Sequence, residues 1–138
     1  MTHPQPQMPP KPPGDDVRGF LPDHDGQQLF EWANQAAPIG PLLEIGSYCG
    51  RSTLWLGQAA KAHDTVVLAL DHHRGSEEHQ PGESHHDEAL VDTTGQFDSF
   101  GEFRRNIAAA GLEDTVIPIV AVSYTHMTLP TNGTVWVG

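Results

Sequence analysis

Residues 41–52, with the sequence PLLEIGSYCGRS, decide how this chain folds. A short apolar run, Leu42–Ile45, leads into Gly46, and three residues later Gly50 opens a stretch with helical character. A strand that passes through a glycine-rich turn into a helix is how α/β proteins present backbone N–H groups to a ligand beyond the strand's carboxyl end. The acid inside the strand, Glu44, indicates which kind of ligand this turn binds.

Two common nucleotide-binding patterns do not fit the turn. The dinucleotide fingerprint G-x-G-x-x-G would need glycines where Tyr48 and Arg51 stand. The phosphate-binding pattern G-x-x-x-x-G-K-[ST] needs four residues between its glycines, but three separate Gly46 from Gly50, and Arg51 replaces the lysine. The pattern present, acid-x-Gly-x-x-x-Gly-x-Ser, resembles motif I of the class I S-adenosylmethionine-dependent methyltransferases.

This resemblance implies S-adenosyl-L-methionine as the cofactor. Gly46 would let the backbone approach the methionine part closely, and the carboxylate of Glu44 would attract the sulfonium or ammonium charge. From the motif and the next strand we predict eight cofactor-binding residues: Glu44, Gly46, Ser47, Tyr48, Gly50, Ser52, Asp71 and His72.

A second strand supports the resemblance. Residues 65–70 (TVVLAL) form a continuous apolar run rich in β-branched residues, typical of a parallel strand buried on both faces. The run ends at Asp71, where one carboxylate can accept hydrogen bonds from both ribose hydroxyls. His72 or His73, beside this acid, is a candidate for cofactor contact or for a base. The resemblance spans roughly Leu42–Val122 and is closest to a bacterial branch with Asp-His after the second strand.

The remaining pattern predicts three helices and a third strand. Asp23 or Asp25 can cap the first helix, Ser52 or a neighbour can cap the second, and Gly111 ends the third. A long polar loop covers residues 72–95. The predicted helices span about 23–37, 51–63 and 97–110, and the third strand spans 115–122.

Pro118 places the third strand at a sheet edge, because proline cannot donate to a ladder. An edge position agrees with the strand order 3-2-1-4-5-7-6 that the resemblance implies. The predicted fold class is α/β, a Rossmann-like three-layer sandwich with a parallel sheet. The sheet is expected to be incomplete, with about three of the seven strands.

Composition narrows the function further. The 138 residues allow one domain, and a formal net charge of −11 disfavours nucleic acid as a partner. The single cysteine, Cys49, excludes an internal disulfide and suits a reducing cytosol; it is either a small filler or a reactive thiol in the ligand turn. With no leader pattern and no long apolar stretch, we expect a cytoplasmic protein without a membrane partner.

The two ends differ from the middle of the chain. Residues 1–14 are rich in proline and are expected to be a disordered leader, with residues 15–122 forming the N-terminal part of a methyltransferase domain. Residues 123–138 (SYTHMTLPTNGTVWVG) resemble a translated sequencing-adapter tail, so we expect a truncated frame joined to a non-native tail. The alternative is a native hairpin that turns at Asn132-Gly133.

The polar loop also raises a metal hypothesis. Imidazoles and carboxylates are zinc and iron ligands, but no two histidines here have the i, i+4 helical spacing of a preformed zinc helix, and a polar loop closes only at an entropic cost. We therefore expect no specific metal site. The histidines concerned are His72, His73, His79, His85 and His86.

The expected function is methyl transfer from S-adenosyl-L-methionine to a small-molecule acceptor. In the resembling family an Asp-Gly-x-His segment after a fourth strand supplies catalytic groups; this chain does not contain it, so no catalytic base is named and this chain is expected to be a poor or inactive enzyme. The alternative function is a non-catalytic nucleotide-binding or interaction module of Rossmann-like fold. The oligomeric state is left open.

Overall fold

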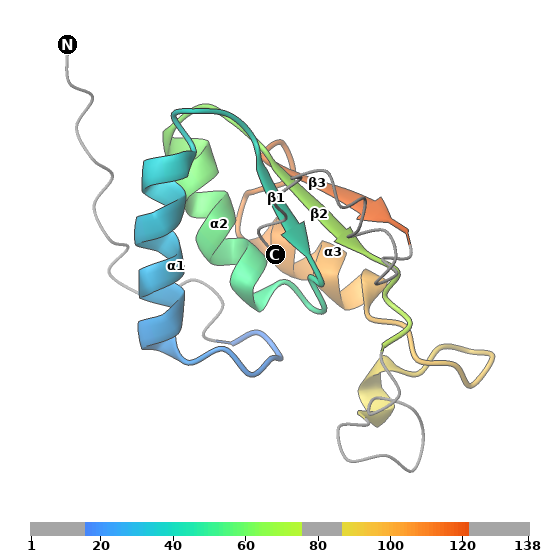
Figure 1. The fold of residues 1–138 in the computed structure, drawn as a ribbon. Helices are drawn as coiled ribbons and strands as arrows, with labels where there is room; N and C mark the ends of the chain where they lie inside the picture. The colour runs from blue at the N-terminus through green and yellow to red at the C-terminus, as the bar shows by residue number, and fades with distance from the viewer. Residues whose placement is uncertain (1–15, 76–86, 122–138) are drawn as a thin grey trace, which may run out of the picture.

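A computed structural model describes residues 16–75 and 87–121 of the protein. Within these residues helices and strands alternate in the manner of an α/β domain (Figure 1). The elements in chain order are α1 (Asp23–Ala36), β1 (Leu42–Ile45), α2 (Arg51–Ala62), β2 (Val67–Asp71), the short 3-10 helix η2 (Glu88–Leu90), α3 (Phe100–Ala109) and β3 (Val116–Val120).

The three strands form one parallel sheet in the order β1-β2-β3. In its register Glu44 lies opposite Ala69, and Ala69 lies opposite Pro118. The predicted α/β class and the 3-2-1 part of the predicted strand order are therefore confirmed, and the fold is an incomplete Rossmann-like domain. Parallel strands joined by helices bring the carboxyl ends of β1 and β2 to one edge, where ligands of such folds bind.

The described helices pack on one face of the sheet. Val67, Ala69 and Val116, which face the helices, belong to the same buried cluster as residues of α1, α2 and α3. The opposite face is aliphatic and only partly covered, and its residues Leu68 and Leu70 are half-buried. The prediction that β2 is buried on both faces is therefore wrong. That face carries Leu43, Ile45, Leu68, Leu70, Ile117 and Ile119.

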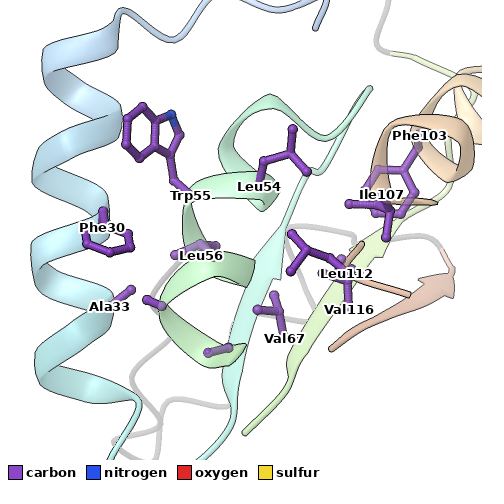
Figure 2. Packing of buried hydrophobic residues seen from close by; sticks show 13 residues of the cluster. Phe30, Ala33, Leu54, Trp55, Leu56, Val67, Phe103, Ile107, Leu112 and Val116 are labelled. Carbon is purple, nitrogen blue, oxygen red and sulfur yellow. The ribbon is translucent and has the colours of Figure 1, made fainter. Parts of the chain in front are cut away.

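The core lies on both sides of α2 (Figure 2). On one side Phe30 of α1 meets Trp55 edge-on, with ring centroids 6.4 Å apart. Close approach of the two helices depends on Gly26, because a Cβ there would lie 2.2 Å from Nε1 of Trp55. On the other side α2 packs on the sheet, where a Cβ on Gly57 would lie 3.3 Å from Cγ2 of Val116, so α2 is held between α1 and the sheet.

Helix starts differ from the predicted caps. Pro22, not an aspartate side chain, is the N-cap of α1, and Gly50 is the N-cap of α2; neither helix has a side-chain cap hydrogen bond. Ser52 donates instead to Glu44. The Ser52 hydroxyl therefore bonds to a carboxylate on β1 and does not cap α2 as predicted.

Helix α3 begins at Phe100, three residues later than predicted. Phe97 forms a bridge with Val91 and packs with Cys49 and Leu90 in a small second cluster, so its apolar side chain does not extend the helix stripe. The C-terminal end is as predicted. Gly111 has φ 70°, and the Leu112 N–H donates to the carbonyl of Ile107 at 3.1 Å, which is a Schellman ending.

The edge position of β3 is confirmed, and its register explains why proline is tolerated. Val67 donates to the carbonyl of Thr115 at 2.9 Å, and Ala121 donates to that of Asp71 at 3.2 Å. Residues on β3 that bond to β2 therefore alternate from Thr115 to Ala121, and Pro118 falls between them. Its missing N–H lies on the outer side of the strand.

Several predictions concern residues outside the described ranges, namely the leader 1–14, the tail 123–138 and the loop histidines His79, His85 and His86. Among residues 16–75 and 87–121, no three His, Cys, Asp or Glu side chains are grouped as metal ligands would be. No helix in the same ranges has the length and apolar character needed to cross a bilayer.

Candidate functional site

The turn between β1 and α2 is a tight left-handed structure. Gly46, Tyr48 and Gly50 have φ of 88°, 51° and 96°. The Gly46 N–H donates to the carbonyl of Leu70 at 2.8 Å, and Gly50 donates back to Ser47 at 2.8 Å. These conformations favour glycine, which explains the two glycines of the motif and shows that Tyr48 is held in place by its contacts.

Asp71 supplies one of those contacts. Its Oδ2 accepts the backbone N–H of Tyr48 at 2.8 Å, and its Oδ1 accepts that of His73 at 2.8 Å. Burial has the largest single effect and would raise the pKa of Asp71. The N–H donors of Tyr48 and His73, together with smaller contributions from the His73 charge and the Ser47 backbone, nevertheless lower the pKa overall. The carboxylate is thus ionised, and each oxygen retains a lone pair with which it can accept from a ligand.

Glu44 is engaged differently. Ser52 donates to its Oε2 at 2.6 Å, and Thr53 donates to its Oε1. The residue is 7% exposed, and burial raises its pKa even though the hydroxyls of Ser52 and Thr53 lower it. Glu44 therefore ties β1 to the first turn of α2, and its predicted contact with a ligand charge stays a prediction.

A cleft of about 460 Å³ opens beside the turn. Four of the eight predicted residues line it: Gly46, Ser47, Tyr48 and Ser52. The other four, Glu44, Gly50, Asp71 and His72, are not among its lining residues. Among residues 16–75 and 87–121, the cleft is lined by Gly19, Phe20, Leu21, Pro22, Asp25, Gly46, Ser47, Tyr48, Arg51 and Ser52.

The two glycines of the motif have different roles. A Cβ on Gly46 would meet no heavy atom within 4 Å, so this backbone faces open space where a ligand can approach. A Cβ on Gly50 would lie 3.2 Å from Cδ2 of Phe103. Gly50 thus serves close packing of the turn against α3, where Asn106 also donates to the carbonyl of Cys49 at 2.9 Å.

The second wall of the cleft, residues 19–25, contains none of the predicted site residues, although the resemblance implies that the first helix helps to cover the cofactor. Arg51 secures this wall: its Nε donates to the carbonyl of Leu21 at 2.8 Å and its Nη1 to that of Val17 at 2.9 Å. From the sequence, Arg51 was singled out only because it stands where the phosphate-binding pattern needs a lysine. These two carbonyl partners lie 30 and 34 residues away along the chain, and no local pattern connects them with Arg51.

The histidines after β2 are not equivalent. His73 is buried, with Nδ1 2.8 Å from Oγ of Ser99 and its ring between Phe100 and Phe103; burial lowers its pKa. Its ring therefore anchors β2 to α3. His72 is half-buried, and its Nδ1 accepts the backbone N–H of Arg74 at 2.8 Å.

Cys49 fits the filler interpretation better than the reactive one. Its side chain is fully buried, and burial raises the pKa of the thiol to about 12. A thiol protonated at neutral pH is a poor nucleophile. Burial likewise raises the pKa of the neighbouring Tyr48 to about 12, and its ring stacks on Phe97 at a centroid distance of 6.2 Å.

Comparison with known proteins places this geometry in context. A family model described as "Methyltransferase domain" matches residues 43–135. Among solved structures, that of cofactor-bound Rv0187 from MTB is similar with 25% sequence identity and a TM-score of 0.51. The similarity covers 84% of this chain and 41% of Rv0187, so this chain spans less than half the length of that protein.

Proposed function

Because this chain belongs to the methyltransferase-domain family, we propose that it binds S-adenosyl-L-methionine and serves methyl transfer to a small-molecule acceptor. The bound cofactor would supply the activated methyl group. The protein's own contribution would be to hold and orient the cofactor, because positioning of the reacting atoms accounts for much of the catalysis of such transfers.

The observation that carries the proposal is Gly46 at the wall of the cleft. Its φ of 88° and the open space beside it allow a ligand to touch the backbone. The neighbouring Ser47 is 2% exposed, and its hydroxyl makes no hydrogen bond within residues 16–75 and 87–121. A buried polar atom without a partner is costly, and a bound ligand would supply one. The residues present therefore fit the methionine part of the cofactor.

Asp71 suits the ribose part. Its carboxylate stands at the carboxyl end of β2, and its lowered pKa keeps it an acceptor for hydroxyl groups. Tyr48 links it to the turn, so the ribose and methionine contacts would belong to one connected structure. Ser52 also lines the cleft. The proposed contacts of Glu44, Gly50 and His72 with the cofactor rest on the sequence resemblance alone.

A small acceptor fits the cleft and the charge. About 460 Å³ is within the range of small-molecule sites. The net charge of −11 opposes a polyanionic substrate. We also propose residues 15–122 as the N-terminal part of the methyltransferase domain.

Titration calorimetry tests the proposal. The protein is titrated with S-adenosyl-L-methionine, S-adenosylhomocysteine and NAD. We expect saturable binding of the two sulfur ligands and much weaker binding of NAD. Tight NAD binding without binding of either sulfur ligand would overturn the proposal. Cofactor binding without methyl transfer to any acceptor, in an assay with a methyl-labelled cofactor, would favour a non-catalytic module.

A further inference from the structure

Two charged side chains line the cleft, Asp25 and Arg51. The guanidinium of Arg51 is directed to the wall: it donates to two backbone carbonyls and lies 3.5 Å from Oδ1 of Asp23, and its side chain is 19% exposed. The Asp25 side chain is 53% exposed, and its Oδ1 lies 3.1 Å from Nε2 of the highly exposed His24. Among the lining residues that the structure describes, the charge offered to a ligand is therefore negative.

Glu44 does not provide this charge. It is absent from the lining of the cleft, and its two carboxylate oxygens already accept from Ser52 and Thr53. The motif predicts an acid for the positive part of the ligand, but the structure places the motif acid beneath the helix. Asp25, on the first turn of α1, is the acid at the surface of the cleft.

Other lining residues suit a cation with an apolar body. Phe20 is 71% exposed in the same lining, and aromatic rings attract cations that approach their faces. The hydroxyl of Ser47 offers an acceptor that makes no hydrogen bond within the described ranges. An ammonium group needs such acceptors as well as a counter-charge.

We propose that Asp25 binds the ammonium group of the methionine part of the ligand. This inference rests on the proposed function, because it presumes a ligand of the S-adenosylmethionine type. It replaces Glu44 with Asp25 as the counter-charge and makes residues 19–25 the part of the cleft that selects ligands carrying an amine.

The test compares one ligand that has this amine with one that lacks the whole amino-acid chain bearing it. S-adenosylhomocysteine carries it, and 5′-methylthioadenosine does not. Calorimetry on the full chain should show that Asp25→Asn weakens S-adenosylhomocysteine binding about three- to tenfold, as expected for loss of one charge-assisted contact. Binding of 5′-methylthioadenosine should not change. Glu31→Gln is the matched control, since it removes one negative charge from an exposed site on the same helix outside the cleft.

Further readouts separate charge from structure. Salt should weaken S-adenosylhomocysteine binding more in the wild type than in Asp25→Asn, because exposed charges are screened, and Asp25→Glu should restore part of the affinity. Equal binding of S-adenosylhomocysteine by wild type and Asp25→Asn, or equal weakening of both ligands, would overturn the inference and leave the proposed function standing. Failure of the wild type to bind any of these ligands would overturn both.

Discussion

The backbone N–H of Tyr48 donates to Oδ2 of Asp71 at 2.8 Å and so joins the turn after β1 to the tip of β2. Tyr48 has a φ of 51°, a conformation that a side chain other than glycine adopts at some cost. The same carboxylate holds His73, whose φ is 62°. One acid therefore fixes two left-handed residues on neighbouring loops.

Replacement of this acid should affect stability and binding together. Asp71→Asn replaces one acceptor oxygen by an amide donor, so one of the two backbone N–H groups loses its partner. We expect a loss of about 1–3 kcal/mol in the free energy of unfolding and weaker binding of S-adenosylhomocysteine. Urea denaturation and calorimetry measure the two effects. Asp114→Asn, at an exposed turn, is the control; equal stability of both variants would contradict the assigned role.

Gly46 should be required for binding beyond its effect on stability. Gly46→Val forces a branched side chain into a left-handed conformation and projects it into the cleft. Gly95→Val is the matched control, because Gly95 has a φ of 82° and equally open surroundings but lies outside the cleft. Both variants should lose about 1–2 kcal/mol of stability, and Gly46→Val alone should lose cofactor binding. Similar affinities in the two variants would place the ligand elsewhere.

Glu44 should make stability depend on pH. Burial raises its pKa in the folded protein above the ordinary value of 4.5, so the unfolded chain ionises first as the pH rises. The stability contributed by the neutral carboxyl is fully present below about pH 4.5 and is lost as the pH rises through the folded pKa. Relative to Glu44→Gln, the wild type should lose stability over that interval. Chemical denaturation at a series of pH values measures the difference; parallel curves would contradict the burial effect.

Two helix glycines should respond in opposite directions to the same substitution. Gly26→Ala places a methyl 2.2 Å from Nε1 of the buried Trp55, and we expect a loss of about 1–3 kcal/mol from overpacking. Gly101→Ala meets only the flexible end of Arg105, at 3.4 Å, and should gain up to about 1 kcal/mol from helix propensity. Thermal or urea unfolding measures both. A gain at Gly26 would mean that α1 can move away from α2.

Local sequence signals were sufficient for the elements around the turn. The apolar run before Gly46 and the β-branched run before Asp71 identified β1 and β2, because buried parallel strands need such residues. The predicted start of α3 at Phe97 was wrong. Phe97 has the apolar character of a residue on the buried side of a helix, but it packs on Cys49. Periodicity does not distinguish between two apolar clusters.

The site was only partly predictable for a related reason. The motif identified Gly46 and Ser47 at the cleft, because a left-handed turn requires glycine at a fixed spacing. Asp25 and the rest of residues 19–25 were not predicted as site residues, since the position of this wall depends on long-range contacts of Arg51 with backbone carbonyls. Every residue has a backbone carbonyl, so contacts of this kind produce no pattern in the sequence.

Pro118 interrupts the row of backbone N–H donors along the outer edge of β3. The residues of β3 whose backbone groups point away from β2 are Val116, Pro118 and Val120, and Pro118 has no N–H to donate. Within the described residues, β1 bonds only to β2, and its other edge is not interrupted by proline. A strand added beside β3 would lack one backbone hydrogen bond at Pro118, so β3 is the less favourable of the two described edges for strand addition.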